Sequence, residues 1–209
     1  MQLLESLRWR YATKRFAADR TVPAEDIRLL KQATNLAATS FGLQPFRVAV
    51  VSDPDLKQRL RAAGYDQPQF TEASHIFVFA ARRTVTPGHV DAFIDRMAEV
   101  REVPRERIAG YGDYIKSSIE GKSAEFLHGW SVRQAYLALG TLLAAAGERR
   151  IDACPMEGFD TAQFDEILGL GERGLAACVV AAVGYRSPED QTQHAAKVRV
   201  PLGELFLDL

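Results

Sequence analysis

The sequence predicts an α+β domain in which a small sheet is covered by helices. Three runs are almost entirely apolar, as buried strands are, whereas longer segments repeat their apolar residues at helical spacing. Helices greatly outweigh the three or four expected strands, and their order is not a regular alternation of strand and helix. The 209 residues fit one domain, with room for one excursion.

The first half of the chain is expected to supply two helices and two strands. Residues Glu25–Ala37 show a helical apolar face, and Pro23 stands near the first turn, where a missing N–H is tolerated. Asp53 and Pro54 begin a second, short helix. The two strands should be buried on both faces because neither alternates with polar residues; they are Phe46–Val51 and Ile76–Ala81.

The second half is expected to supply a central helix and a third strand. Residues 132–146 form a helix so apolar that it belongs in the middle of the protein. Its large side chains recur at helical spacing and should face the core; they are Val132, Tyr136, Leu139 and Leu143. The third strand, Leu175–Val183, ends at Gly184.

Residues 99–129 differ from the rest of the chain. They are highly charged and contain four glycines, a proline and scattered aromatic residues. Two interpretations stay open: a solvated helical hairpin, or a mobile cover over a substrate pocket.

The tail, residues 200–209, is unusually apolar for a chain terminus. Five of the eight residues after Pro201 are large and apolar. Because such a segment is expected to be covered, it should pack either on its own domain or on another subunit.

Charge and composition argue against several classes of protein. The 26 basic and 27 acidic residues give a net charge of −1, so no global field favours nucleic acid or an anionic membrane. The first ten residues lack the apolar core of a signal peptide, and the longest apolar run is about half of the ~18–20 residues that span a bilayer. The two cysteines, Cys154 and Cys178, suit a reducing cytoplasm.

Three chemical motifs are absent or misleading. Gly169–Gly174 matches GxGxxG, but it follows a helix and begins a strand, the reverse of a dinucleotide-binding loop. The four histidines are too far apart to predict a metal site. No GxSxG motif indicates a nucleophilic hydrolase.

Two basic groups stand at opposite ends of the chain, in Arg8–Arg15 and Lys197–Pro201. They are either solvated surface or the Arg and Lys donors of a phosphate site. Between them, Pro155–Gly158 is expected to be a loop between the central helix and the next one. It is either a plain turn or a segment that presents backbone N–H groups to a ligand.

Together these residues resemble the FMN-dependent nitroreductase family, especially its oxygen-insensitive NAD(P)H nitroreductase branch. The resemblance spans nearly the whole chain and depends on six motifs in the same order. They are Arg10–Phe16, Thr39–Phe46, Glu72–His75, Arg133–Tyr136, Cys154–Phe159 and Lys197–Pro201.

The resemblance implies one nitroreductase-like FMN-binding domain over residues 1–209, in an intertwined homodimer wrapped by the tail. Arg10, Lys197 and Arg199 correspond to the clamp on the FMN phosphate, and Lys14 to the lysine beside flavin N1 and O2. Pro155–Gly158 would cover one flavin face and give an N–H to N5, and Thr39–Gly42 would reach FMN from the other subunit. The implied cofactor residues are Arg10, Tyr11, Ala12, Thr13, Lys14, Thr39, Ser40, Phe41, Gly42, Asp66, Gln69, Pro155, Met156, Glu157, Gly158, Lys197 and Arg199.

Three positions depart from that branch. Ala12 replaces a serine that helps to hold the phosphate, Asp66 replaces an asparagine, and Gln69 replaces a lysine near the pyrimidine edge. Less positive charge therefore faces the reduced flavin, which alters the expected redox potential and substrate preference.

The implied activity is two-electron, ping-pong transfer from NADH or NADPH through FMN to a small-molecule acceptor such as a nitroaromatic or quinone. FMN carries the chemistry, so no catalytic acid or base is expected, and Lys14 gives electrostatic support. The same fold also serves dihydropteridine reduction, reductive dehalogenation and flavin fragmentation. A flavin-binding redox module without turnover is the alternative outside the enzymes.

Overall fold

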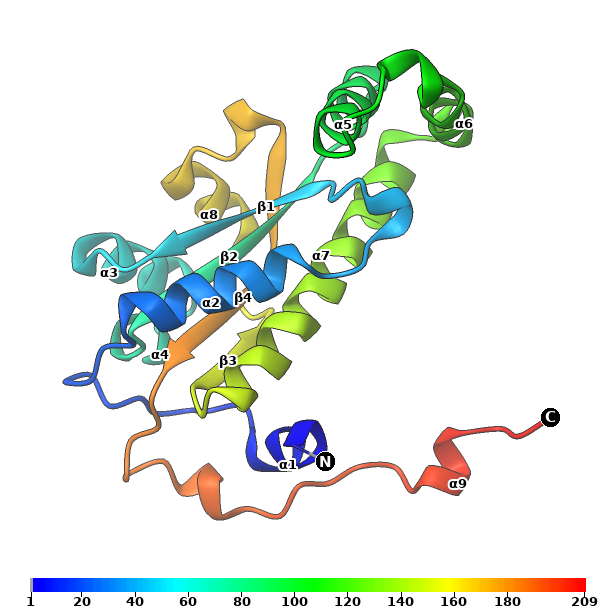
Figure 1. The fold of residues 1–209 in the computed structure, drawn as a ribbon. Helices are drawn as coiled ribbons and strands as arrows, with labels where there is room; N and C mark the ends of the chain where they lie inside the picture. Colours follow the sequence, from blue (N-terminus) through cyan, green and yellow to red (C-terminus); the bar gives the residue numbers. More distant parts are fainter. Residues whose placement is uncertain (1) are drawn as a thin grey trace.

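The computed structural model describes residues 2–209 and contains a four-stranded antiparallel sheet between layers of helices (Figure 1). The strand order is β1-β2-β4-β3, and every neighbouring pair is antiparallel. The strands are β1 (Phe46–Val51), β2 (His75–Arg82), β3 (Asp152–Met156) and β4 (Leu175–Gly184). The predicted α+β class is confirmed.

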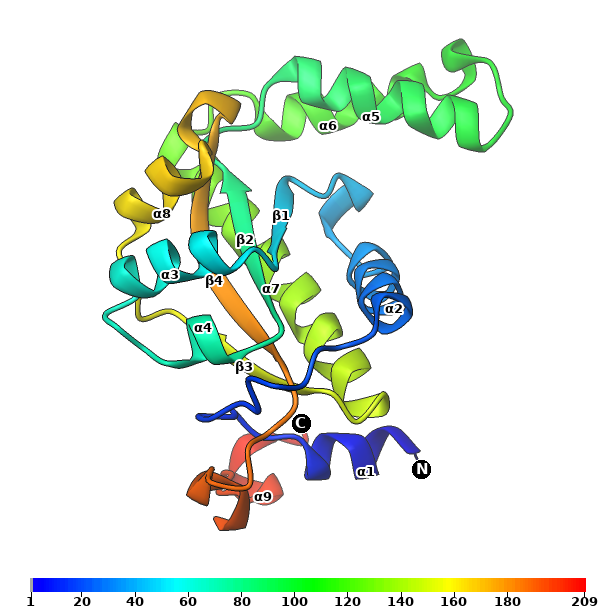
Figure 2. The same ribbon diagram turned by 90° about the vertical axis from the view of Figure 1, so that its left-hand side faces the viewer.

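The helices form two layers and one projection. One sheet face carries α2 (Ala24–Asn35) and α7 (Ala124–Glu148), with α1 (Gln2–Trp9) against the end of α7; the other carries α3 (Pro54–Ala63), α4 (Gln69–Glu72) and α8 (Thr161–Leu168). A pair, α5 (Pro87–Val100) and α6 (Ala109–Ile119), extends away from the sheet (Figure 2). The short elements are α9 (Leu202–Leu205) and the 3-10 turns η1 (Ser40–Gly42), η2 (Arg105–Arg107), η3 (Gly171–Arg173) and η4 (Gln191–His194).

The two central strands, β2 and β4, hold the core together. Alternate side chains of β2 point to opposite faces, so Phe77 and Phe79 pack with Leu142 of α7, whereas Ile76 packs with Phe70 on the α3–α8 side. All five side chains are at most 1% exposed. Here the predicted burial of both strand faces is confirmed.

Helix α7 turns to the sheet a face that differs in part from the predicted one. Its buried positions are mostly small residues, and Tyr136 is 36% exposed. The buried residues include Ser131, Gln134, Ala135, Ala138 and Leu142. Of the predicted stripe, Leu139 is buried in the core and Leu143 packs against it, whereas Tyr136 is not buried. Small side chains let the helix approach the sheet closely, so the prediction from large residues is only partly correct.

The edge strands explain two further corrections. In β1 only Phe46 and Val51 are buried, because no strand lies on its outer side, so the predicted burial of both faces is wrong for the single chain. Pro155 and Met156 were predicted in a loop, but they form the end of β3 and pair with Ala181 and Val180 of β4. Proline is tolerated there because β3 is also an edge strand.

The two unusual segments both contain helix but differ in burial. The charged segment 99–129 contains α6, which packs against α5 around Val90, Ile94 and Ile115. The tail leaves the domain, and its side chains, such as Leu207 at 83%, are exposed in the single chain. Over residues 2–209, no helix has the length and apolar character needed to cross a membrane.

Candidate functional site

The two basic groups from opposite ends of the chain meet in one pocket. A pocket of about 340 Å³ lies between the end of α1 and the segment that follows η4. Its cationic lining includes Arg8, Arg10, Lys197 and Arg199. The Lys197 ammonium donates to the carbonyl oxygens of Leu7 at 2.5 Å, Arg8 at 3.1 Å and Arg10, near the end of α1. Lysine is favourable there because the last carbonyls of a helix lack partners within it.

The pocket carries more positive charge than its own partners neutralise. Burial first, and then the nearby Arg199, lower the pKa of Arg10. Burial, Arg10 and Arg199 likewise lower the pKa of Lys197. The Arg10 Nε is buried and has no hydrogen-bond partner. A buried, unpaired donor beside two further cations is the environment that an anion such as a phosphate would complete.

Asp190 attaches the C-terminal half of this pocket to its N-terminal half. Its side chain, 1% exposed, accepts from the Tyr11 hydroxyl at 2.9 Å and from the backbone N–H groups of Lys14 at 2.8 Å and Arg15 at 3.3 Å. Its other oxygen accepts from Thr192 N–H at 2.9 Å and so starts η4. Burial opposes ionisation of Asp190, but these donors outweigh it and lower its pKa.

A second buried carboxylate, Asp152, also joins the N-terminal segment to the C-terminal one. The Arg186 backbone N–H and Nε donate to it at 2.8 and 2.9 Å. The Arg186 guanidinium then lies over the rings of Trp9 at 4.2 Å and Tyr11 at 4.6 Å. The Thr13 hydroxyl, fully buried, donates to Asp152 at 3.4 Å. Thr13 therefore supports the segment from within the protein.

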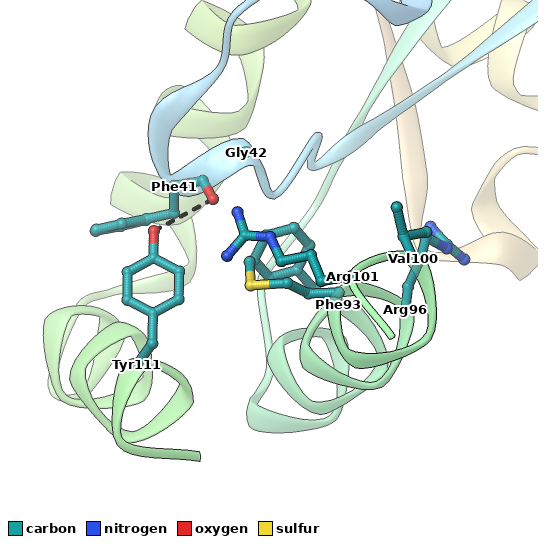
Figure 3. Close-up of a pocket in the computed structure, with 8 residues that line it drawn as sticks. Phe41, Gly42, Phe93, Arg96, Val100, Arg101 and Tyr111 are labelled. Atoms are coloured by element: carbon teal, nitrogen blue, oxygen red, sulfur yellow. Dashed lines mark hydrogen bonds between the residues drawn. The ribbon is translucent and has the colours of Figure 1, made fainter. Parts of the chain in front are cut away.

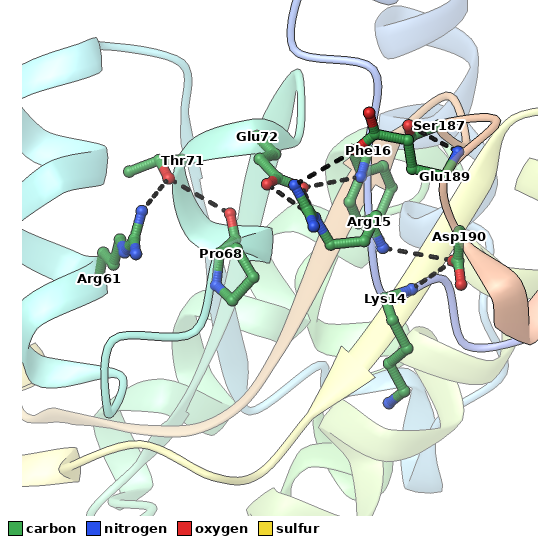
Figure 4. Close-up of polar contacts among 10 residues, drawn as sticks. All are labelled: Lys14, Arg15, Phe16, Arg61, Pro68, Thr71, Glu72, Ser187, Glu189 and Asp190. Atoms are coloured by element: carbon green, nitrogen blue, oxygen red, sulfur yellow. Dashed lines mark hydrogen bonds and ion pairs between the residues drawn. The ribbon is translucent and has the colours of Figure 1, made fainter.

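Lys14 lies beside β3. Its backbone N–H faces Asp190, whereas Figure 4 shows its side chain extending away from that carboxylate. Ala12 forms an isolated parallel bridge with Ala153, so the segment runs alongside β3. Burial raises the pKa of the Cys154 thiol, and nearby Lys14 and Arg10 oppose this rise. Lys14 is thus near Cys154, the residue that precedes the Pro155–Gly158 segment.

Residues 12–16 are also attached to α4. Arg15 Nε donates to Glu72 Oε1 at 2.9 Å, and Phe16 N–H donates to Glu72 Oε2 at 3.0 Å (Figure 4). Gln69 lies one turn earlier on α4, is 6% exposed, and its Oε1 is buried without a partner. A second orphaned polar atom, this time an acceptor, therefore lies on the element next to Lys14.

Asp66 occupies a strained turn before α4. Its φ is 58°, and its carboxylate accepts from Arg61 Nε at 2.7 Å in an exposed ion pair. The neighbouring Gln67 Nε2 donates to the carbonyl of Gly158 at 2.6 Å. The turn that carries Asp66 is therefore fastened to the end of the Pro155–Gly158 segment.

Glu157 is the exposed tip of that segment. Its Oε1 accepts a hydrogen bond of 2.6 Å from the Tyr136 hydroxyl of α7. Burial first, and then this bond, raise the pKa of Tyr136, so it stays a donor. The misjudged face of α7 thus supplies a contact at the site.

The Thr39–Gly42 stretch lies on the other side of α7. Ser40 N–H donates to Gln134 Oε1 at 2.8 Å, whereas Glu157 is held by Tyr136, two residues further along the helix. Successive helical residues turn by about 100°, so these two side chains leave α7 on nearly opposite sides. The chain therefore brings residues 10–12 together with 197–199, and 66–69 together with 155–158, and leaves Thr39–Gly42 across α7.

Two carboxylates at the site, Asp152 and Asp190, were missed by sequence reasoning. Each is a single acidic residue without a recognisable motif, and each acts on partners more than 100 residues away in the chain. A weak signal existed in Asp190, since Asp often begins a helical turn.

The fold and the site define an α+β protein with a cationic pocket beside one edge of its sheet. Residues 7–185 match the nitroreductase family, and the chain belongs to it. The oxygen-insensitive NAD(P)H nitroreductase of Enterobacter cloacae is 30% identical over 211 residues, which cover 95% of each chain. YfkO of Bacillus subtilis is 31% identical over 209 residues, covering 94% of this chain and 95% of that one.

The fold is also found in solved structures. A structure from Exiguobacterium sibiricum, described as a complex with FMN, has a TM-score of 0.86 at 18% identity and covers 99% of this chain and 97% of its own. The predicted nitroreductase-like fold is therefore confirmed.

Proposed function

We propose that this protein is an FMN-dependent NAD(P)H oxidoreductase that reduces nitroaromatics, quinones or similar small molecules by two electrons. The observation that carries the proposal is the buried, unpartnered Nε of Arg10 beside Lys197 and Arg199. The phosphate monoester of FMN is an anion of the right chemistry for that pocket. The activity named for the Enterobacter cloacae relative and the FMN in the Exiguobacterium structure support the same choice.

The remaining site residues fit the rest of the cofactor. Lys14 supplies a cation for the flavin N1 and O2 edge, and the buried Gln69 Oε1 supplies an acceptor for an N–H group of the pyrimidine ring. Bound FMN would supply the redox chemistry, while the chain provides binding, charge and exclusion of water. Ala12 offers no hydroxyl to the phosphate, so the clamp depends on its cations.

The donor and the acceptor would use one face of the site in turn. The Gly169–Gly174 turn leads from α8 into β4 and forms no dinucleotide-binding unit. NAD(P)H would therefore give up its hydride and leave as NAD(P)+ before the acceptor binds, which gives parallel double-reciprocal plots. The two cysteines, both free thiols, favour a reducing compartment, and we assign the enzyme to the cytoplasm.

A second copy of the chain would complete the site. Thr39–Gly42 lie across α7 from the other site residues, and the apolar tail is exposed. The free edge of β1 is flanked by a pocket on each sheet face, one lined by Val48 and Val50 and the other by Ala49. An extended segment beside β1 would place alternate side chains into the two pockets. We assign this edge to the tail of the second copy, in an intertwined homodimer.

Deleting residues 202–209 tests the homodimer. The truncated protein should sediment as a monomer or aggregate and should bind FMN more weakly, because an apolar surface loses its cover. A well-folded truncated dimer with full FMN content would refute the role of the tail.

The visible spectrum of the purified protein tests the cofactor. Wild-type protein should be yellow, and Arg10→Ala with Arg199→Ala should release FMN, since each charge-assisted hydrogen bond contributes roughly 1.5–3 kcal/mol. Arg59→Ala, on the exposed side of α3, is the matched control and should retain FMN. Protein that stays colourless after incubation with FMN would refute the proposal, and a yellow protein without NADPH–quinone turnover would indicate a redox module.

A further inference from the structure

A second pocket lies between α5, α6 and η1, away from the cationic pocket. Its volume is about 480 Å³, which is within the range of pockets for small ligands. Figure 3 shows its walls, which are Phe41, Gly42, Phe93, Arg96, Met97, Val100, Arg101 and Tyr111. Most of this lining is apolar or aromatic, so a flat apolar body would fit it.

The two arginines of this pocket are not neutralised by its walls. No acidic residue is among the lining residues, and Arg101 extends toward Phe41 while Arg96 lies near Val100 (Figure 3). Two nearby cations are paired: Arg105 of η2 with Asp95 at 2.6 Å, and Lys116 of α6 with Asp91 at 2.7 Å.

The wall opposite α5 contains a strained residue. Phe41 has a φ of 59°, which is unfavourable for a side chain of this size. The Tyr111 hydroxyl donates to the carbonyl oxygen of Phe41 at 3.4 Å. The Phe41 ring packs edge-on against the Tyr114 ring, with centroids 6.1 Å apart. Such strain persists where neighbours hold it, and it is concentrated at ligand sites.

We propose that this pocket selects electron acceptors in which an aromatic ring carries an anionic group, such as a carboxylate. The proposal rests on the proposed function, because it takes Thr39–Gly42 to border the flavin of the other subunit. Phe93 and Met97 contact the ring, and Arg96 and Arg101 bind the anionic group. The enzyme would therefore prefer an aromatic acid to its neutral ester.

Two acceptors of matched structure test this preference: 4-nitrobenzoate and its neutral methyl ester. The ratio of their kcat/KM values should fall about tenfold in the Arg96→Gln, Arg101→Gln double variant, since each exposed ion pair contributes about threefold to fivefold. The ratio should also fall in 0.5 M NaCl, because exposed charges are screened. Arg107→Gln, an exposed arginine of the same excursion outside the pocket, should leave the ratio unchanged.

Equilibrium dialysis of benzoate against the holoprotein gives a readout that needs no turnover. Benzoate should bind the wild type and the Arg107 variant equally, and the double variant several-fold more weakly. An unchanged acid-to-ester ratio, unchanged benzoate binding, or an effect confined to the KM for NADPH would overturn the proposal. Those results with a yellow, active enzyme would leave the proposed function intact, whereas protein without FMN would refute that function itself.

Discussion

Replacing Asp190 by Asn should destabilise the cationic pocket, although the Arg and Lys residues of the pocket are unchanged. The carboxylate accepts four hydrogen bonds, from the Tyr11 hydroxyl and three backbone N–H groups. An amide keeps one oxygen, so three of these bonds can persist as neutral bonds, each weaker by roughly 0.7 kcal/mol. The fourth donor, at Thr192, would face an NH₂ group and lose its partner, at a cost of about 1 kcal/mol. The sum is a loss of about 3 kcal/mol of stability.

Urea unfolding at fixed protein and FMN concentrations measures this loss. FMN affinity, from flavin fluorescence, should fall about tenfold, because Lys197 and Arg199 follow the turn that Asp190 begins. Glu189→Gln is the matched control, since that side chain is 77% exposed and its nearest approach to Arg15 is 3.9 Å. Stability and FMN affinity of the Asp190→Asn variant within twofold of those of Glu189→Gln would refute the reasoning.

The pH dependence gives the same prediction a second test. The folded-state pKa of Asp190 is lowered, so its stabilisation is present above the unfolded pKa of about 3.9. It is lost as the pH falls through the folded-state value. The wild-type and Asp190→Asn curves of stability against pH should therefore converge in acid, and a constant gap down to pH 2 would contradict this account.

Two further predictions concern stability. Burial and the bond to Asp190 raise the pKa of Tyr11 to about 12. The stability that protonated Tyr11 contributes is therefore complete below the unfolded pKa of about 10 and is lost as the pH rises through about 12. Tyr11→Phe should remove one late step from the ultraviolet titration. A Cβ on Gly64 would lie 2.1 Å from the Phe70 ring, so Gly64→Ala should lower the free energy of unfolding by about 2–3 kcal/mol. Gly171→Ala, where a Cβ meets open space, is the control and should change it by no more than about 0.5 kcal/mol. Equal melting temperatures of the two variants would contradict the clash.

The central strands could be predicted because their apolar runs require burial whatever the partner. The face of α7 could be predicted only in part, because its large residues and its small ones both recur at helical spacing. Ala135 and Ala138 approach the sheet since they are small, and Tyr136 is left on the rim. In β3, Pro155 was read as a sign of a loop, although an edge strand tolerates a missing N–H.

The candidate site could also be predicted only in part. Local motifs predicted its cations, and the chain does bring Arg10, Lys197 and Arg199 into one pocket. The carboxylates Asp152 and Asp190 could not be predicted, because their role depends on which distant backbone N–H groups the fold presents to them. An isolated Asp shows its partners only once the chain is folded.

The position of α7 connects the proposed cofactor site to the proposed homodimer. This helix separates Thr39–Gly42 from Glu157 within one chain, so a single copy has the proposed phosphate clamp but only one side of the proposed flavin site. The proposed clamp and the tail also belong to one continuous segment, since Arg199 directly precedes the tail. Ordering of this segment by a bound phosphate would therefore position the tail on the second copy, and docking of the tail would in turn hold Arg199 in place. Cofactor binding and dimer formation would then stabilise each other, as any ligand that prefers the assembled state must.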